Sequence, residues 1–119
     1  MKYFALFFLF IVFGAEAAHI LSARLDSDQK NLLIDVAYSG GCKKHIFKLK
    51  MDGMCLETYP VQCAAELKEE IEDGEDYCQG IIRHQAVFSL RKHKLHDEYY
   101  RGAKLTIYNR KSSFSLKLP

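Results

Sequence analysis

The sequence lacks the short motifs by which most enzyme and cofactor sites are recognised. It contains no G-x-S-x-G nucleophile elbow, no P-loop, no H-E-x-x-H zinc motif and no Rossmann glycine pattern. Internal repeats, low-complexity tracts and an interdomain linker are also missing. The sequence therefore predicts no catalytic residue and no cofactor.

Only one hydrophobic run is long, and it lies at the N-terminus. Lys2 precedes an apolar stretch at 4–13, and Ala15-Glu16-Ala17 then fits the small-residue rule for a signal-peptidase site. The stretch is shorter than the ~20 residues that cross a bilayer. A membrane anchor and a buried first strand are the alternatives. Because charge, apolar run and small residues come in the order typical of export, we predict a signal peptide at 1–17. Residues 18–119 would form a single exported β domain, periplasmic or secreted, without a transmembrane anchor.

Charge is nearly balanced overall but unevenly placed. Seventeen basic and 15 acidic residues give a formal net charge of +2, which does not demand nucleic acid or an anionic membrane as a partner. Seven carboxylates lie within 66–76, and basic residues dominate from 79 onward. Residues 69–76 lack EF-hand spacing and are interpreted as a solvated loop, with cation binding or a basic partner as alternatives.

Four cysteines remain after the predicted cleavage, namely Cys42, Cys55, Cys63 and Cys78, and the first lies too far along for lipid attachment at a mature N-terminus. An even number in a small exported domain predicts two disulfides. A hairpin at Asp52-Gly53 would place Cys42 opposite Cys63 and leave Cys55 for Cys78. The competing arrangement is a local Cys55–Cys63 loop with Cys42–Cys78. Pro60 favours the second slightly, because proline interrupts a long regular hairpin.

Short runs with a period of two dominate the rest of the chain. They lie at 19–25, 32–38, 45–51, 54–59, 61–67, 78–90, 104–108 and 113–118, separated by polar turns. Such spacing predicts an all-β fold, a small disulfide-bonded antiparallel β-sandwich or barrel of seven to eight strands. Residues 92–100 suit a short helix or an ordered loop, whereas residues 68–76 suit an exposed hairpin loop.

Histidines supply the candidates for a metal or a catalytic site. His45, His84, His93 and His96, with Cys42, include ligand types that zinc prefers. Export favours oxidation of Cys42, which removes a thiolate, so no metal site is predicted. A nuclease using His84 and His93 with Lys94 is an alternative, although no spacing singles these residues out.

A basic cluster with neighbouring aromatic residues is the predicted binding surface. It consists of Arg91, Lys92, Lys94, Tyr99, Tyr100 and Arg101. Such a patch suits phosphates, an envelope polysaccharide or an acidic protein surface. The low net charge argues against nucleic acid as the main partner.

The block Tyr38-Ser39-Gly40-Gly41-Cys42-Lys43-Lys44-His45 resembles a segment of short exported bacterial β-rich proteins of unknown function. Those proteins carry Tyr-Gly-Gly-Gly-Cys-x-x-His before a strand, and here Ser39 replaces the first glycine. The later blocks are Thr58-Tyr59-Pro60-Val61-Gln62 and Asp76-Tyr77-Cys78. The resemblance implies an exported β domain in which Cys42 pairs with Cys78, and it transfers no catalytic residue.

These observations lead to a primary hypothesis and an alternative. The first is a non-catalytic exported binding or envelope-associated domain, in one form an inhibitor-type module, whose partner is another protein or an envelope polysaccharide. The alternative is a small metal-binding or nuclease-like secreted protein that uses its histidines.

Overall fold

A computed structural model describes residues 17–53 and 55–119, which form seven strands and two short 3-10 helices. The strands are β1 (His19–Leu25), β2 (Asn31–Gly40), β3 (His45–Met51), β4 (Gln62–Ile71), β5 (Gly80–Ser89), β6 (Lys104–Tyr108) and β7 (Ser113–Lys117). The 3-10 helices are η1 (Glu72–Gly74) and η2 (Glu98–Tyr100). The predicted signal peptide lies almost wholly outside the described residues.

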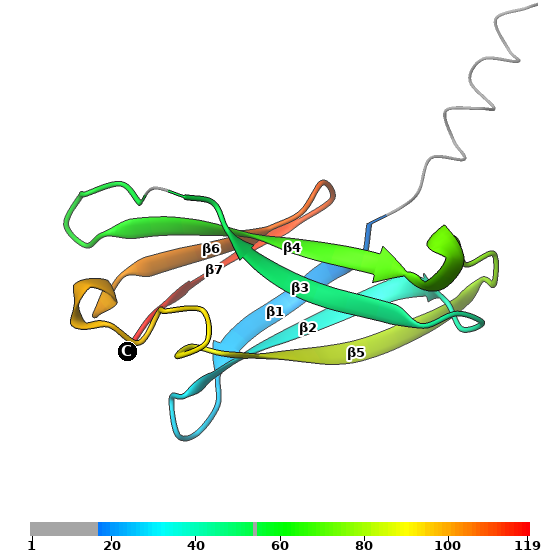
Figure 1. Ribbon diagram of the computed structural model, residues 1–119, viewed down its shortest axis with the longest axis horizontal. Helices are drawn as coiled ribbons and strands as arrows, with labels where there is room; N and C mark the ends of the chain where they lie inside the picture. Colours follow the sequence, from blue (N-terminus) through cyan, green and yellow to red (C-terminus); the bar gives the residue numbers. More distant parts are fainter. Residues whose placement is uncertain (1–16, 54) are drawn as a thin grey trace, which may run out of the picture.

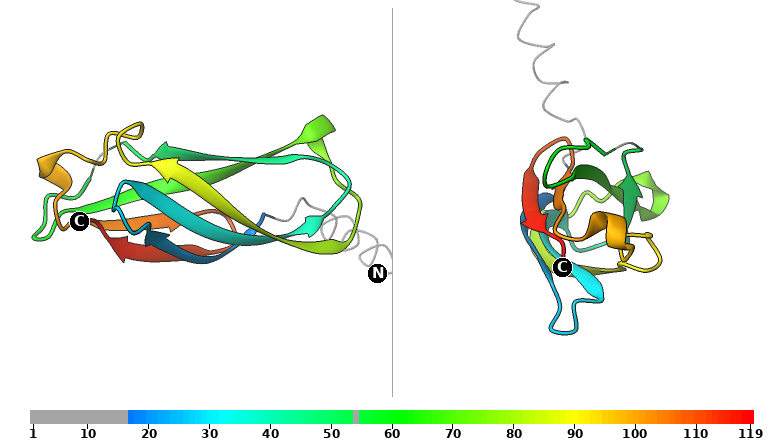
Figure 2. Two further views of the ribbon diagram at one scale, coloured as in Figure 1. Left: turned by 90° about the horizontal axis from the view of Figure 1, so that it is seen from below. Right: turned by 90° about the vertical axis from the view of Figure 1, so that its left-hand side faces the viewer.

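The strands form two sheets, which pack as the two layers of a sandwich (Figures 1 and 2). One sheet has the order β1-β2-β5, and the other has the order β3-β4-β6-β7. The predicted all-β sandwich with two disulfides is therefore confirmed. One pairing departs from the antiparallel rule, because β4 and β6 run parallel with Gln62 opposite Lys104. After β4 the chain runs through β5 in the other sheet and then returns as β6 beside β4. This excursion is the crossover connection that a parallel pair needs.

Alternating side chains of the two sheets meet in a common core. From β2, Leu32, Ile34 and Val36 are completely buried, and Leu105 and Ile107 of β6 face them from the opposite sheet. A strand with one face on the core repeats its apolar residues every second position, which is the pattern seen in the sequence. Among the described residues, none with a polar or charged side chain is buried over its whole surface.

The prediction of an exposed loop at 68–76 is wrong for its first half. Strand β4 continues to Ile71, which pairs with His45 at the start of β3. Lysines on β3 offset the acidic residues of β4, since Lys48 Nζ lies 3.0 Å from Glu70 Oε2. Favourable cross-strand charge pairs of this kind allow a charged segment to remain a strand.

The expected strand at 54–59 reduces to one isolated bridge between Leu56 and Gln62, and Met54 lies outside the described residues. Asp52-Gly53 is not a tight hairpin turn, because the register pairs Met51 with Ala65 and leaves a long connection.

Two disulfides link Cys42 to Cys78 and Cys55 to Cys63, the second of the arrangements that the sequence left open. The first joins the β2–β3 turn to the segment before β5, and the second closes the 55–63 loop at the other end of the sandwich. Among the described residues, no helix is both long enough and apolar enough to cross a bilayer.

Candidate functional site

The turn between β2 and β3 is built from two glycines with different roles. Gly41 has φ = 115°, a conformation that side chains rarely adopt. Gly40 lacks room for any side chain, because a Cβ there would lie 2.5 Å from Asp76 Oδ2 and 2.9 Å from His45 Nε2. The Gly-Gly pair therefore allows the chain to reverse and the Asp76 carboxylate to approach the backbone.

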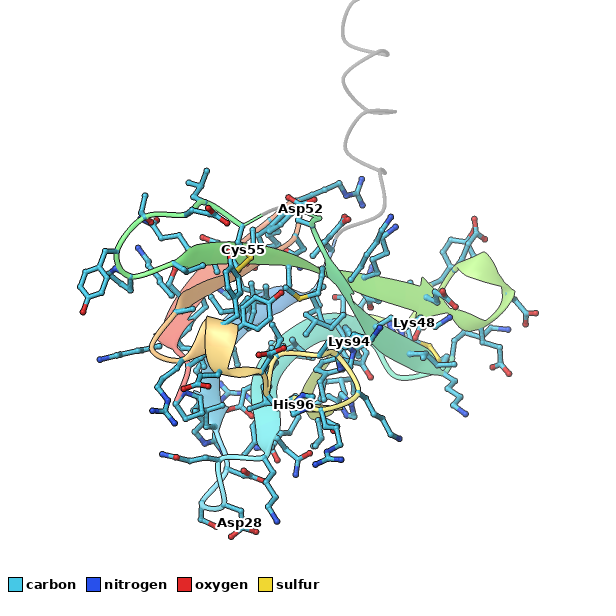
Figure 3. All side chains as sticks on the ribbon, turned by 60° about the vertical axis from the view of Figure 1, so that its left-hand side comes forward. Asp28, Lys48, Asp52, Cys55, Lys94 and His96 are labelled. Atoms are coloured by element: carbon cyan, nitrogen blue, oxygen red, sulfur yellow. A yellow bond between two sulfur atoms is a disulfide. The ribbon has the colours of Figure 1, made fainter. Side chains whose placement is uncertain are left out.

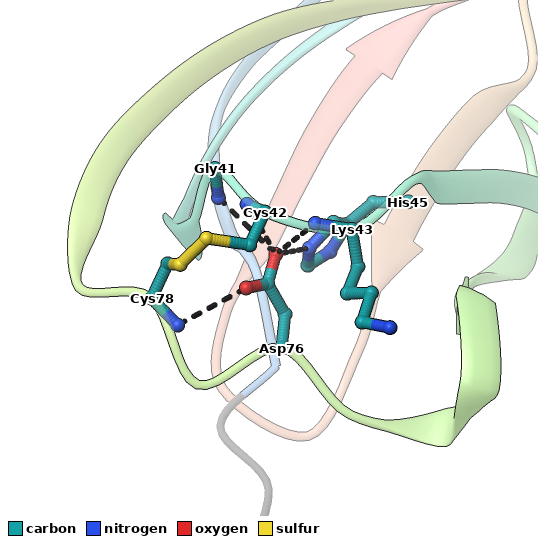
Figure 4. Close-up of a disulfide and its surroundings, with 6 residues drawn as sticks. All are labelled: Gly41, Cys42, Lys43, His45, Asp76 and Cys78. Carbon is teal, nitrogen blue, oxygen red and sulfur yellow. Dashed lines mark hydrogen bonds and ion pairs between the residues drawn. A yellow bond between two sulfur atoms is a disulfide. The ribbon is translucent and has the colours of Figure 1, made fainter.

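Asp76 is held by the backbone of that turn (Figure 4). Its Oδ2 accepts from the amides of Gly41 and Lys43, both at 3.1 Å, and from the amide of Cys42 at 3.4 Å. Its Oδ1 accepts from the amide of Cys78 at 3.1 Å. Successive amides that converge in this way form a nest for an anion, here the protein's own carboxylate.

His45 lies between two carboxylates. Its Nδ1 is 2.6 Å from Glu69 Oε2, and its Nε2 is 2.7 Å from Asp76 Oδ2. When both carboxylates are ionised they only accept, so both ring nitrogens must donate and the ring must be an imidazolium. The side chains of His45 and Asp76 are each 1% exposed, and that of Glu69 is 13% exposed. We call Glu69, His45 and Asp76 the His45 cluster.

The pKa values agree with this charge state. Burial of the ring favours neutral imidazole, but the hydrogen bonds to Asp76 and Glu69 outweigh it and raise the pKa of His45 above 6.5. The hydrogen bond from His45, with the backbone amides of the nest, lowers the pKa of Asp76 to about 2. The pKa of Tyr38 is raised by burial and by the two nearby carboxylates.

Aromatic rings cover the His45 cluster on one side. The Tyr38 ring stacks on His45 with the centroids 4.0 Å apart, a geometry that favours a cationic imidazole. Phe47 contacts Tyr38 and also stacks on His84, at centroid distances of 5.8 and 5.6 Å. The cluster is thus shielded from water by its own fold.

This arrangement is unsuited to chemistry on an external substrate. Both nitrogens of His45 are already engaged, so they cannot shuttle a proton or hold a metal without breaking a carboxylate contact. Among the residues that the structure describes, one group has metal-like spacing, formed by Cys42, Asp76 and Cys78. Its two sulfurs form a disulfide, and oxidised sulfur is not the thiolate that zinc requires.

The other candidate histidines have contacts of their own and do not join the His45 cluster. His84 stacks on Phe47, and His93 Nδ1 lies 2.8 Å from the carbonyl of Ser89 with its ring edge-on to Phe88. His96 lines a cleft of about 590 Å³ with Asp97, Glu98 and Arg101. Within 17–53 and 55–119, no three of these histidines meet at metal-ligand distance.

The predicted basic surface is an ordered loop. Leu95 is 3% exposed and anchors the loop in the core, and its amide donates to the carbonyl of Leu90 at 2.8 Å. Asp97 accepts from the amide of Tyr99 and caps η2. Tyr100 packs on the core, while Arg91, Lys92, Lys94, Tyr99 and Arg101 are exposed.

A second loop, 52–61, lies at the same end of the molecule (Figures 1 and 2). It exposes Leu56 (64%) and Tyr59 (101%), and the Cys55–Cys63 disulfide closes it. Tyr99 Oη donates to Glu57 Oε1 at 3.3 Å and so connects the two loops. Figure 3 shows Cys55 above the loop that carries Lys94 and His96. We define the loop end as Leu56, Tyr59, Arg91, Lys92, Lys94, Tyr99 and Arg101.

Sequence reasoning missed both Leu56 and Tyr59 as surface residues and Glu69 and Asp76 as partners of His45. The sequence pattern predicts a strand at 54–59, in which alternate residues would be buried. The acidic run predicts a solvated loop for Glu69 and Asp76. A signal for Asp76 existed, since the Gly-Gly-Cys and Asp-x-Cys blocks that carried the resemblance come together through the Cys42–Cys78 disulfide.

No protein-family model, no curated protein and no solved structure matches this chain. The geometry of the two regions described above is therefore the basis for a functional assignment.

Proposed function

We propose that this protein is an exported, non-catalytic binding domain, periplasmic or secreted, whose partner is a protein with an acidic contact surface. The observation that supports the proposal is the composition of the loop end. Leu56, Tyr59 and Tyr99 expose hydrophobic and aromatic surface beside arginine and lysine. Tyrosine and arginine are enriched at the energetically important centres of protein interfaces.

The loop end is presented on rigid supports. The Cys55–Cys63 disulfide and the Tyr99–Glu57 hydrogen bond restrain the 52–61 loop, and buried Leu95 restrains the 91–101 loop. A surface that is ordered before binding loses less conformational entropy when a partner docks. Loops at one end of a β-sandwich are a common location for such a surface.

A protein partner is favoured over an envelope polysaccharide by ring geometry. The rings of Tyr99 and Tyr100 are at 87° to one another, with centroids 4.9 Å apart. This pair is therefore not a flat two-ring platform on which the sugar rings of a polysaccharide could stack. The exposed charged residues of the loop end, Arg91, Lys92, Lys94 and Arg101, suit the polar rim of a protein interface instead.

The experiment is affinity capture from the exported fraction with matched variants. One variant combines Leu56→Ser with Tyr59→Ser, and a second combines Lys92→Glu with Lys94→Glu. Controls carry changes of the same kind at exposed positions elsewhere, namely Tyr77→Ser, and Lys44→Glu with Lys68→Glu. The proposal expects a protein that wild type and both controls retain and that both loop-end variants lose.

Two results would contradict the proposal. One is a partner that every loop-end variant retains, which would place binding elsewhere. The other is that wild type binds purified envelope polysaccharide and the loop-end variants lose this binding, which would make the partner a polysaccharide. A soluble partner inhibited on binding would identify an inhibitor-type module, whereas a partner fixed in the envelope would identify an envelope-associated domain.

A further inference from the structure

The backbone at Ala18 is fixed from two directions. Its amide nitrogen donates to Glu69 Oε1 at 3.1 Å, and its carbonyl accepts from Asn109 Nδ2 at 2.6 Å. Ala18 is 1% exposed although it precedes the first strand. The nitrogen of Ala18 therefore lies directly beside a carboxylate whose other oxygen contacts His45.

The His45 cluster attracts a further positive charge at this point. Two ionised carboxylates and one imidazolium leave the cluster with one excess negative charge. Around the cluster, Tyr38 stacks on the His45 ring, Lys43 Nζ pairs with Asp73 at 2.9 Å, and Lys68 and Arg110 line the cleft beside Glu69. The Ala18 nitrogen contacts Glu69 directly, and a cation at that nitrogen would interact strongly with the carboxylate.

We propose that the chain is hydrolysed between Ala17 and Ala18, and that the new α-ammonium of Ala18 forms an ion pair with Glu69 that completes the His45 cluster. In the hydrolysis, water adds to the carbonyl carbon of Ala17 and the carbon–nitrogen bond breaks. Ala17 leaves as a carboxylate, and the Ala18 nitrogen takes up protons to become an ammonium. The peptidase that removes export leaders supplies the catalysis.

The position of the cut rests on the proposed export and on the Ala15-Glu16-Ala17 sequence, whereas the cation site rests on the structure. The cut and the cation site point to the same residue. The small-residue rule makes Ala18 the first residue after cleavage, and the structure places the nitrogen of Ala18 beside Glu69. The burial of Ala18 adds an order of events. A peptidase needs an extended, accessible bond, so cleavage precedes the docking of residue 18 against β4.

The ion pair is tested on purified chains that begin at Ala18, one with a free α-amine and one acetylated at that amine. Each is made with the native Glu69 and with the Glu69→Gln substitution. In the free native chain, NMR titration is expected to give an α-amino pKa about one unit above its ordinary ~7.7–8.0, and one unit corresponds to a tenfold change in the folding equilibrium. Acetylation should then reduce the folding equilibrium constant about tenfold in the native chain and leave it nearly unchanged in the Glu69→Gln variant.

An ordinary α-amino pKa in the free native chain, or equal stability of the free and acetylated native chains, would overturn the ion pair. These two measurements need no Glu69→Gln protein, so they decide the matter even where that variant fails to fold. Intact mass of the protein from the exported fraction tests the cut, and a chain that starts at any residue other than Ala18 would overturn it. A failure of export would contradict the proposed function, whereas a wrong start in an exported protein would contradict only this inference.

Discussion

Asp76 Oδ2 lies 2.7 Å from His45 Nε2, and both side chains are 1% exposed. The same oxygen accepts from three consecutive backbone amides, so one carboxylate orients the histidine and also fixes the turn between β2 and β3. This double role makes the His45 cluster a structural element, and the first three predictions below test it.

Replacement of His45 by glutamine should destabilise the fold by about 2–4 kcal/mol, because it leaves two buried carboxylates without their shared cation. The measurement is urea denaturation at pH 6. His96→Gln is the matched control, because His96 is exposed and should change the unfolding free energy by less than about 0.5 kcal/mol. Equal effects of the two substitutions would contradict the assigned charge state.

Stability should be greatest between about pH 4 and pH 6.5. His45 has a raised pKa in the folded state, so its contribution is complete below 6.5 and is lost as the pH rises through the folded value. Asp76 has a folded pKa of about 2, so its contribution is present above 3.8 and is lost as the pH falls from 3.8 towards 2.

Denaturation across pH 2–9 measures both limbs of this profile. His45→Gln should flatten the decline above pH 6.5, and Asp76→Asn should reduce the decline below pH 4. An unchanged alkaline limb in the His45 variant would mean that another group titrates there.

Gly40→Ala should destabilise the protein by about 1–3 kcal/mol, since its Cβ would collide with Asp76 and His45. Gly74→Ala separates this collision from backbone strain, because Gly74 has φ = 83° but open space around its Cα. The Gly40 variant should also raise the pKa of Asp76, measured by NMR titration, while the Gly74 variant should not. A Gly40 variant with wild-type stability and an unshifted Asp76 would refute the close packing described for this turn.

The two disulfides should differ in their contributions. Cys42–Cys78 spans 36 residues and Cys55–Cys63 spans 8, which corresponds to about 4 and about 2.5 kcal/mol in the chain-entropy description. Paired Cys→Ser variants, unfolded in denaturant, measure the difference. Loss of Cys55–Cys63 should also weaken binding at the loop end, whereas loss of Cys42–Cys78 should act on stability alone. The opposite order of stability loss would show that native-state effects dominate.

The strands were predictable wherever burial alone decides the pattern. The alternation of Leu32, Ile34 and Val36 requires only one buried face, and so does that of Leu105 and Ile107. The end of β4 was not predictable, because its acidic residues are tolerated only where lysines of β3 lie opposite. The parallel β4–β6 pair depends on a crossover through the other sheet, which local sequence does not record.

The His45 cluster was less predictable than the fold. Glu69 and Asp76 lie 24 and 31 residues from His45, and many other carboxylates lie within the same acidic run. Charge density therefore indicated solvent exposure, although two of these groups are shielded by Tyr38 and by the disulfide. Part of the loop end was predictable, because its basic residues are clustered in the sequence. Leu56 and Tyr59 lie far from that cluster in the sequence and come near it only in the folded protein.

The contact between β1 and the β6–β7 turn has a consequence for biosynthesis. Ile20 donates its amide to Ser112 Oγ at 2.8 Å, and the two residues are 92 positions apart. Pairings this distant in sequence form slowly, because a long loop must close before the new contacts can stabilise the fold. In the proposed export, β1 would emerge first, and its apolar face would stay uncovered until the final hairpin follows. A nascent chain arrested before residue 112 should therefore depend on a holding chaperone, whereas the finished chain should not.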